Sequence, residues 1–277
     1  MTQTALITGT SSGIGRAAVK EFAANGWNVL ATMRDPGGEA GRDDPLDALD
    51  GVAVGRLDVT DLASIDAAVA SATEKFGGVD VLVNNAGYGA YGPLEATPRE
   101  KIVRQFDTNV IGLLDVTKAV LPQMRTRGSG VIVNVSSMGG KITMPLGSLY
   151  HGTKFAVEGL SEALSYELGA VGVAMKIVEP GIITTDFSGR SMDLSVDQEM
   201  AEYMPVVQGL MAAAQAERPT SSPEFVAKII LGAATDGTDQ LRYIAGPDAE
   251  QILANRAALD DDAFLAGMKQ TYGLDQL

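Results

Sequence analysis

The sequence predicts an α/β fold with a doubly wound, mostly parallel sheet of about seven strands. Two observations predict this class. Short apolar segments alternate with segments whose apolar residues recur at helical spacing. Several of the short segments, such as VDVLVNN and GVIVNVSS, are apolar at consecutive positions, which is typical of parallel strands covered by helices on both faces. This strand–helix–strand alternation implies right-handed crossovers.

The individual elements can be placed along the chain. Residues 61–76 carry an apolar stripe at helical spacing, with Thr60 as the expected N-cap. Ser222-Pro223-Glu224 is typical of a helix start, because a capping serine precedes proline in the first turn. The seven expected strands are Thr4–Thr8, Asn28–Thr32, Val52–Leu57, Val79–Asn84, Val131–Val135, Val173–Val178 and Leu241–Ala245.

One domain is expected over residues 1–277, because neither an internal repeat nor a linker divides the chain. Residues 35–50 are polar and rich in turn-forming residues, so we expect a surface excursion between the second and third strands. Residues 186–221 interrupt the alternation of strands and helices. We expect them to form a helical substrate lid within the domain.

Composition excludes several classes of function. The formal net charge of −14 disfavours nucleic acids and anionic membranes as partners, because both require a basic surface. With no cysteine and one histidine, the chain is expected to have no disulfide and no metal site. No apolar run approaches the ~20 residues that span a bilayer, and the N-terminal segment lacks a signal-peptide pattern. A cytoplasmic location is the resulting expectation.

A glycine-rich turn, ALITGTSSGIG, leads from the first strand into a helix. Glycines there allow tight turning and close approach of the backbone to a ligand, and the helix N-terminus suits a pyrophosphate. The alternative is an ordinary strand–turn–helix corner, but the position at the first crossover of a parallel sheet favours a Rossmann-like nucleotide site. The cofactor-binding residues expected in this turn are Gly9, Ser11, Ser12, Gly13, Ile14 and Gly15.

The end of the second strand indicates which dinucleotide is bound. An acidic residue there accepts the ribose hydroxyl of NAD, whereas an arginine accommodates the 2′-phosphate of NADP. The sequence holds Met33 followed by Arg34, which favours NADP. Asp35 keeps NAD as an alternative, because a shift of one residue in register would make it the ribose acceptor. Both charges could also be solvated loop residues.

Tyr150 and Lys154 in YHGTK stand four residues apart, which places them on one face of a helix. A free tyrosine has a pKa of ~10, too high for it to accept a proton readily near neutrality. The lysine ammonium and the positive ring of an oxidised nicotinamide would both stabilise the phenolate. Taken alone, such a pair is more often two surface residues.

Together these motifs resemble the short-chain dehydrogenases/reductases. TGTSSGIG, NNAG at Asn84–Gly87, Asn109, the serine pair before Met138, YHGTK and the segment Pro180–Thr185 occur in the order found in the single-domain branch of that family. The resemblance covers residues 3–185 closely. Through ATMRDP and YHGTKFAVEGLSEAL the chain is most similar to NADP-preferring members related to 17β-hydroxysteroid and retinol dehydrogenases.

The resemblance implies catalytic roles for four residues. Tyr150 would exchange a proton with the substrate oxygen, and Lys154 would lower the pKa of that tyrosine and hold the nicotinamide ribose. Ser137 would hydrogen-bond the substrate oxygen, because it lies at the family's usual offset before Tyr150, unlike Ser136. Asn109 would sit in a local helix distortion and hold a water that relays protons through Lys154.

The resemblance also implies cofactor contacts beyond the glycine turn. Asp58 would contact the adenine amine, and Asn85 would support the end of the fourth strand beside the adenine ribose. Ile183 and Thr185 would hold the carboxamide. The cofactor-binding residues expected outside the glycine turn are Arg34, Asp58, Val59, Asn85, Ala86, Gly87, Tyr150, Lys154, Pro180, Gly181, Ile183 and Thr185.

A lipophilic ketone, aldehyde or alcohol is the expected small-molecule substrate, because the segments expected to line its pocket contain few carboxylates. A non-catalytic NADP(H)-sensing protein stays an alternative, although such relatives generally lack the tyrosine or the lysine. A homodimer or homotetramer through the helices at about 98–127 and 150–168 is implied by the resemblance, and His151 is expected to pack or face solvent. The expected pocket residues are Tyr88, Tyr91, Pro93, Leu94, Met138, Ile142, Met144, Leu146, Leu149, Met192, Leu194, Tyr203, Met204, Val207 and Met211.

Overall fold

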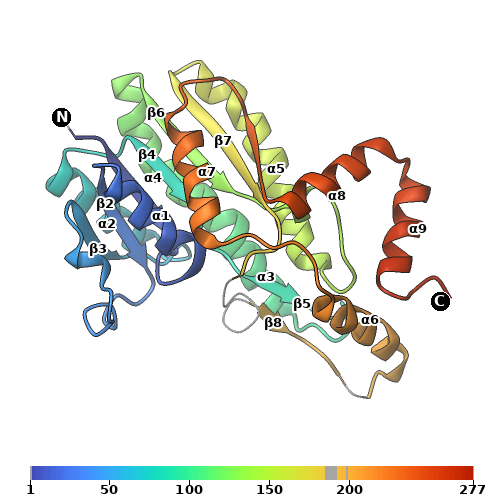
Figure 1. The fold of residues 1–277 in the computed structure, drawn as a ribbon. Coiled ribbons are helices and arrows are strands. Elements are labelled where there is room, and N and C mark those ends of the chain that lie inside the picture. The colour runs from blue at the N-terminus through green and yellow to red at the C-terminus, as the bar shows by residue number, and fades with distance from the viewer. Residues whose placement is uncertain (1, 185–191, 198, 277) are drawn as a thin grey trace.

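A central sheet of seven parallel strands organises the protein, in the order β3-β2-β1-β4-β6-β7-β9 (Figure 1). The computed structural model describes residues 2–184, 192–197 and 199–276. Every strand pair in this sheet is parallel, which confirms the doubly wound, Rossmann-like class. The strands are β1 (Thr4–Thr8), β2 (Asn28–Met33), β3 (Val52–Arg56), β4 (Val81–Asn84), β6 (Gly130–Val135), β7 (Val173–Pro180) and β9 (Arg242–Ala245).

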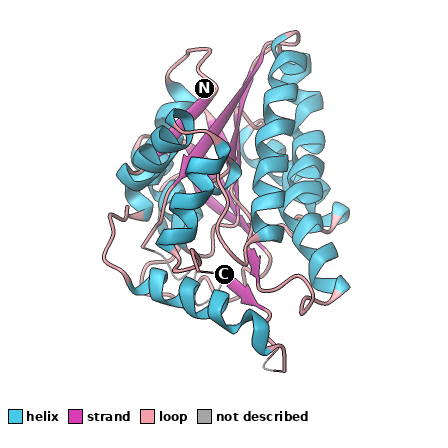
Figure 2. Ribbon diagram, turned by 90° about the vertical axis from the view of Figure 1, so that its right-hand side faces the viewer, coloured by secondary structure: helices cyan, strands magenta, loops and turns pink. Residues whose placement is uncertain are grey.

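Helices cover both faces of the sheet (Figure 2). On one face, α1 and α7 pack against each other and against the strands, through side chains such as Phe22 and Ile230. On the other face, α2, α4 and α5 form a second core that includes Ile65 and Met124. Strands buried on both faces explain the consecutive apolar positions in the sequence. The helices are α1 (Gly13–Ala24), α2 (Leu62–Phe76), α3 (Arg99–Phe106), α4 (Gly112–Arg127), α5 (Ser148–Gly169) and α7 (Pro223–Thr235).

Two predicted helix starts have different outcomes. Ser222 caps α7 as predicted, because its hydroxyl accepts the Phe225 N–H. The prediction of Thr60 as the cap of α2 is wrong. Asp61 is the N-cap and accepts hydrogen bonds from the backbone of Ala63 and Ser64. The Thr60 hydroxyl instead donates to Asp58, so the helix begins one residue later than the pattern suggests.

The predicted surface excursion at residues 35–50 is anchored by a buried carboxylate. Glu39 is only 3% exposed and forms an ion pair of 2.7 Å with Arg16 on α1. Its carboxylate also accepts the Leu46 N–H at 2.9 Å. Leu46 is fully buried in the core beneath α1. The segment therefore has a structured inner side that its polar composition did not predict.

A second, two-stranded sheet lies beyond the carboxyl ends of the central strands (Figure 1). It pairs β5 (Gly89–Tyr91) with β8 (Met192–Leu194) in parallel. A side chain at Gly92 would collide with the Ser195 carbonyl, so this glycine permits the close approach of the two segments. α6 (Met204–Gln215) follows β8. β8 and α6 belong to the predicted lid, of which residues 186–191 and 198 lie outside the described residues.

The last residues form α8 (Pro247–Ala258) and α9 (Asp261–Thr271). α8 starts directly after β9 and therefore at the carboxyl end of the sheet. The chain after α9 returns to α6, where Gly209 lies so close to the Tyr272 carbonyl that a side chain would collide with it. Among the helices of the described residues, none is long and apolar enough to cross a bilayer.

Candidate active site

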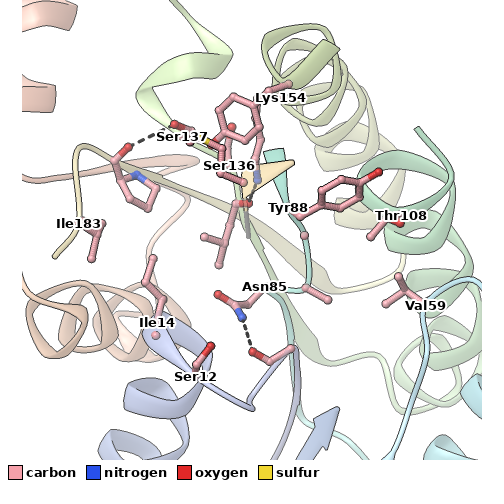
Figure 3. A pocket seen from close by; sticks show the side chains of 18 of the residues that line it. Ser12, Ile14, Val59, Asn85, Tyr88, Thr108, Ser136, Ser137, Lys154 and Ile183 are labelled. Carbon is pink, nitrogen blue, oxygen red and sulfur yellow. Dashed lines mark hydrogen bonds between the residues drawn. The ribbon is translucent and has the colours of Figure 1, made fainter. Parts of the chain in front are cut away.

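A cavity of about 800 Å³ opens at the carboxyl ends of the central strands. Its lining comes from the turns after β1, β2, β3, β4, β6 and β7, and from the start of α5. In open parallel sheets this edge, where the strand order reverses, is the usual ligand crevice. Figure 3 shows how side chains from these separate turns point toward one another.

The glycine turn after β1 fits a phosphate group. Gly9 has a φ of +71°, and a side chain there would collide with the Ala86 backbone. A side chain at Gly15 would collide with the Gly9 carbonyl and the Asn85 amide. Within the described residues, no side chain caps α1 and no acidic residue lies in its first turn. The positive end of the helix therefore faces the cavity, which Gly9, Ser11, Ser12, Gly13 and Ile14 line.

Asn85 ties this turn to the neighbouring strand. Its side-chain amide donates to the Thr8 carbonyl at 2.9 Å and to the Gly9 carbonyl at 3.1 Å. The Thr8 hydroxyl in turn accepts the backbone N–H groups of Asn85 and Ala86. Four hydrogen bonds thus fix the ends of β1 and β4 relative to each other. Asn85, Ala86 and Gly87 all line the cavity.

The charged residues after β2 separate into two roles. Arg34 is exposed and lines the cavity. The Asp35 carboxylate accepts the Gly37 N–H at 2.9 Å and so caps its own turn. Arg16, the other arginine near the glycine turn, is bound by Glu39 and Asp44. The geometry therefore makes Arg34, and not Asp35, the residue available to a ligand at this position.

The turn after β3 completes the part of the cavity near Arg34. Asp58 and Val59, which follow β3, both line it. The Asp58 carboxylate accepts the backbone N–H and the hydroxyl of Thr60, so its orientation is fixed. A side chain at Gly112 would collide with Val59, and this glycine allows α4 to approach the turn closely.

Tyr150 and Lys154 lie on the same face of α5 and line the cavity together. The Lys154 ammonium is 5.9 Å from the centre of the Tyr150 ring and donates to the Val135 carbonyl at 2.8 Å. Burial raises the pKa of Tyr150, and its hydrogen bond with Ser137 opposes this rise. Burial also lowers the pKa of Lys154 to about 8, although the nearby Glu158 carboxylate favours the charged form.

Ser136 and Ser137 both line the cavity, and Ser137 is the one whose hydroxyl hydrogen-bonds Tyr150. It caps the short 3₁₀ turn Met138–Gly140, and its Oγ accepts the Gly139 N–H at 3.0 Å. Its Oγ also lies 3.5 Å from the Pro180 carbonyl (Figure 3). The Ser136 hydroxyl is buried and has no hydrogen-bond partner among the described residues.

Asn109 lies in a helix distortion, as the family resemblance implied. Residues Asp107–Ile111 form a π-helical turn between α3 and α4. Asn109 is buried, and its side chain holds the Tyr88 backbone through two hydrogen bonds of 3.1 and 2.8 Å. It also donates to the Thr153 hydroxyl on α5. Asn109 thus connects the turn after β4 to the helix of Tyr150, and its role in proton relay stays a prediction.

The turn after β7 is anchored by a residue that sequence analysis missed. Pro180, Gly181 and Ile183 line the cavity, whereas Thr185 lies outside the described residues. Asp248, at the start of α8, accepts the Ile182 N–H at 2.6 Å. A side chain at Gly181 would collide with this carboxylate. Only the Gly-Pro-Asp sequence at the start of the last helices hinted at such an anchor.

The opposite end of the cavity has an aromatic and methionine-rich lining. The Tyr91 and Tyr150 rings stack with their centres 5.5 Å apart. Of the residues expected there, Tyr88, Tyr91, Met138, Met144 and Met192 line the cavity.

A group of polar residues at one side of the cavity was not among the residues expected from the sequence. Arg104 of α3 donates to the Tyr88 hydroxyl at 3.0 Å and pairs with Asp193 of β8 at 2.9 Å. Lys101 pairs with the same carboxylate at 2.6 Å. Arg104 and Asp193 both line the cavity. Because these residues lie about ninety positions apart, no local pattern could have brought them together.

Comparison with known proteins agrees with this geometry. A family model described as short chain dehydrogenase matches residues 3–193. The chain belongs to this family of oxidoreductases. An uncharacterised oxidoreductase from Schizosaccharomyces pombe is 44% identical over 230 residues, covering 83% of this chain and 96% of that protein. Human 17-beta-hydroxysteroid dehydrogenase type 1 is 34% identical over 268 residues, covering 92% of this chain and 80% of that protein.

Solved structures show the same fold. A short-chain dehydrogenase from Streptomyces avermitilis superimposes with a TM-score of 0.82 at 34% identity, covering 100% of this chain and 98% of that one. The structure of ElxO with NADP bound has a TM-score of 0.72 at 28% identity, covering 88% of this chain and 98% of that one. The predictions of a short-chain dehydrogenase fold and of an oxidoreductase are confirmed.

Proposed function

We propose that this short-chain dehydrogenase uses NADP(H) to interconvert a lipophilic ketone or aldehyde and its alcohol. One observation carries the proposal: a phosphate-binding turn, Arg34 and the group Ser137, Tyr150 and Lys154 line the same cavity. A dinucleotide that extends from Arg34 would bring its nicotinamide end to the tyrosine. The non-catalytic alternative loses support, because a sensor has no need of three converging catalytic side chains.

The residues present fit a dinucleotide with a 2′-phosphate. Gly9 and Gly15 create a cradle that a side chain would fill. Arg34 can offer two parallel hydrogen bonds to a phosphate, and Asp35 is engaged in its own turn. The similar protein ElxO has been solved with NADP bound. We therefore place the adenosine phosphate at Arg34, the adenine near Asp58 and Val59, and the nicotinamide near Pro180 and Ile183.

In the proposed reaction, the nicotinamide supplies the hydride and the protein supplies position and proton. Ser137 and Tyr150 would both donate hydrogen bonds to the substrate oxygen, where negative charge develops during reduction. Tyr150 would then transfer its proton to that oxygen, and it would accept the proton in the oxidative direction. Because burial raises the pKa of Tyr150, oxidation requires the positive charge of Lys154 beside the phenol.

The lining near Tyr150 supports a lipophilic substrate. Tyr91, Met138, Met144 and Met192 contribute apolar surface there, and methionine adapts to irregular shapes. The human relative with 34% identity is a hydroxysteroid dehydrogenase by name. Residues 186–221 would form the lid over this substrate.

The central helices support the proposed homo-oligomer. Ile111, in the π-helical turn before α4, and Phe155 and Tyr166, on α5, are large apolar or aromatic side chains that are 49%, 45% and 76% exposed. A paired copy would cover this surface. Light scattering coupled to gel filtration distinguishes a dimer or tetramer from a monomer. A cytoplasmic location stays a prediction.

A screen of NADPH consumption tests the proposed function directly. The purified protein is mixed with NADPH or NADH and a panel of ketones and aldehydes that range from polar to lipophilic. We expect NADPH-dependent turnover with the lipophilic members and weaker turnover with NADH. Turnover with neither cofactor on any carbonyl would contradict the proposal, and NADPH binding without turnover would favour the sensing alternative.

A further inference from the structure

His151 is the only histidine in the chain, and it is buried directly behind the catalytic tyrosine. It follows Tyr150 on α5 and is 1% exposed. The two rings meet edge to face with their centres 5.5 Å apart. The imidazole faces the segment 138–147, which connects Ser137 to α5, so the prediction of a packing residue is confirmed and solvent exposure is excluded.

Both ring nitrogens of His151 bind the backbone of this segment. Nδ1 lies 2.9 Å from the Gly139 carbonyl oxygen. Nε2 accepts the Met144 N–H at 3.0 Å. A carbonyl can only accept and an amide N–H can only donate, so the proton must sit on Nδ1 and Nε2 must be bare. The two contacts thus require one neutral tautomer, and burial lowers the pKa of His151 and favours that neutral form.

Two glycines allow the backbone to enclose the ring. A side chain at Gly139 would come within 2.9 Å of Nδ1. A side chain at Gly147 would come within 2.6 Å of the ring carbon Cδ2 and 3.1 Å of Tyr91. Neither glycine has a positive φ, so close approach to the imidazole is the reason that these positions must stay small. The His151 backbone N–H also donates to the Gly147 carbonyl at 2.8 Å.

The clamped segment carries groups of the active site. The Gly139 N–H donates to the Ser137 hydroxyl oxygen at 3.0 Å, and the Gly139 carbonyl is the group that His151 holds. The imidazole therefore fixes the residue that orients the serine. Its second contact holds Met144, which lines the substrate end of the cavity.

We propose that His151 is a positioning residue whose neutral imidazole ties Gly139 to Met144 and so holds the Ser137 hydroxyl where the substrate oxygen binds. The inference rests on the proposed carbonyl reduction. It assigns His151 no contact with substrate or cofactor. Its effect is transmitted through the backbone of residues 139 and 144 alone.

Three variants test the clamp. His151→Phe keeps a flat ring and removes both hydrogen bonds. His151→Asn can place an amide N–H near the position of Nδ1, and His151→Gln can place a carbonyl oxygen near the position of Nε2. We expect His151→Phe to lower kcat by ~10- to 100-fold, the range expected when a catalytic group is displaced by about 1 Å. The Kd for NADPH should change less than about twofold, because neither Gly139 nor Met144, the two residues that the imidazole holds, is among the expected cofactor contacts.

The Asn and Gln variants together show which of the two hydrogen bonds of His151 determines kcat. His151→Asn should recover most of the kcat because it restores the bond to Gly139, whereas His151→Gln should stay low in kcat. Full kcat in His151→Phe would overturn the inference, as would equal kcat values for the Asn and Gln variants. An equal loss of kcat and NADPH binding in every variant would show a merely structural role. If His151→Phe does not fold, the Asn and Gln variants decide.

A measurement on the unmodified protein needs neither variant nor substrate. Its single imidazole gives one set of ¹⁵N NMR signals, which report the protonation of each ring nitrogen. We expect a protonated Nδ1 and a bare Nε2 at neutral pH, with and without NADPH. A proton on Nε2 would overturn the clamp even if the enzyme reduces ketones. Absence of carbonyl reduction would instead refute the proposed function and leave this NMR result standing.

Discussion

The two ends of the cavity are built differently. At the cofactor end, the lining residues follow directly on the central strands β1 to β4 and β7, and hydrogen bonds such as Asn85 to Thr8 hold neighbouring turns together. At the substrate end, the lining comes from the two-stranded sheet β5–β8, from α3 and from the segment clamped by His151. Ion pairs such as Arg104–Asp193, which joins α3 to β8, hold these segments together.

The two ends therefore differ in the substitutions that they tolerate. The cofactor end depends on backbone geometry that only glycine allows, as at Gly9 and Gly15. The substrate end also contains glycines that must stay small, Gly92, Gly139 and Gly147, but its lining includes side-chain pairs and flexible methionines, which can be replaced with less damage to the fold. Substitutions at the two ends should therefore separate cofactor binding, chemistry and substrate binding from one another.

Tyr150→Phe has the largest expected effect, because it removes the proton donor where the two ends meet. We expect turnover to fall at least ~100-fold, the scale of general acid–base catalysis, while NADPH binding measured by fluorescence stays intact. Tyr91→Phe is the matched control, because its ring stacks on Tyr150 and is, like Tyr150, half-buried. It should retain most of the turnover. Wild-type turnover in Tyr150→Phe would remove the tyrosine from the mechanism.

Arg34→Ala should act on the cofactor end alone. Loss of the hydrogen bonds to a 2′-phosphate should weaken NADPH binding by ~10- to 100-fold. The Kd for NADH should change little, and isothermal titration with both cofactors measures the contrast. Arg42→Ala is the control, because Arg42 pairs with Glu39 at 3.1 Å. An equal loss of affinity for both cofactors would exclude Arg34 as the phosphate ligand.

Asp193→Asn should act on the substrate end alone. The substitution removes the carboxylate shared by Lys101 and Arg104. Partly exposed ion pairs contribute ~0–1 kcal/mol each, so we expect KM for the carbonyl to rise a few-fold. Steady-state kinetics should show an unchanged KM for NADPH. Asp197→Asn, on the exposed continuation of the same segment, should change neither value. An increase confined to the KM of NADPH would contradict the assignment of Asp193 to the substrate end.

Glu179→Gln should change the stability of the fold and not the binding at either end of the cavity. The change should be confined to one pH range. Burial, together with the nearby Glu158 carboxylate, raises the pKa of Glu179 to about 7 from the usual 4.5. The protonated form is therefore favoured in the folded state. Its contribution is complete below about pH 4.5 and is lost as pH rises through about 7.

The melting temperature should accordingly fall by roughly a few degrees between pH 5 and pH 8, and Glu179→Gln should reduce that fall. Glu162→Gln is the control. Arg242 lies 3.6 Å from the Glu179 carboxylate and also pairs with the exposed Glu162 carboxylate, whose pKa is lowered by that hydrogen bond. Differential scanning calorimetry at several pH values measures both variants. An unchanged fall in Glu179→Gln would assign the pH dependence to another group.

Sequence patterns predicted the parts of the molecule that depend on local rules. All seven strands of the central sheet were predicted within two residues at each end, because apolar runs and glycine turns mark them. The glycine turn, Tyr150 and Lys154, which short motifs indicated, and Ser137, which the family resemblance implied, all line the cavity.

The rest depends on contacts between distant residues. Asp248 supports the turn at Gly181 from α8, and Asp193 meets Lys101 and Arg104 across the cavity mouth. Glu39 lies in a segment whose composition predicts only a surface loop, and it pairs with Arg16 on α1. No local pattern encodes such pairs, because tertiary packing and not propensity brings them together. The strand β8 is three residues long and was missed because so short a segment carries no periodicity.

The central claim is that Tyr150 delivers the proton beside a nicotinamide held at the carboxyl ends of the strands. A crystal structure with NADP and an alcohol product tests it most directly. We predict that the Tyr150 hydroxyl and the Ser137 hydroxyl both hydrogen-bond the product oxygen, with the product carbon within ~3.5 Å of the nicotinamide carbon that carries the hydride. A nicotinamide bound away from Tyr150, with the phenol facing only protein, would contradict the account.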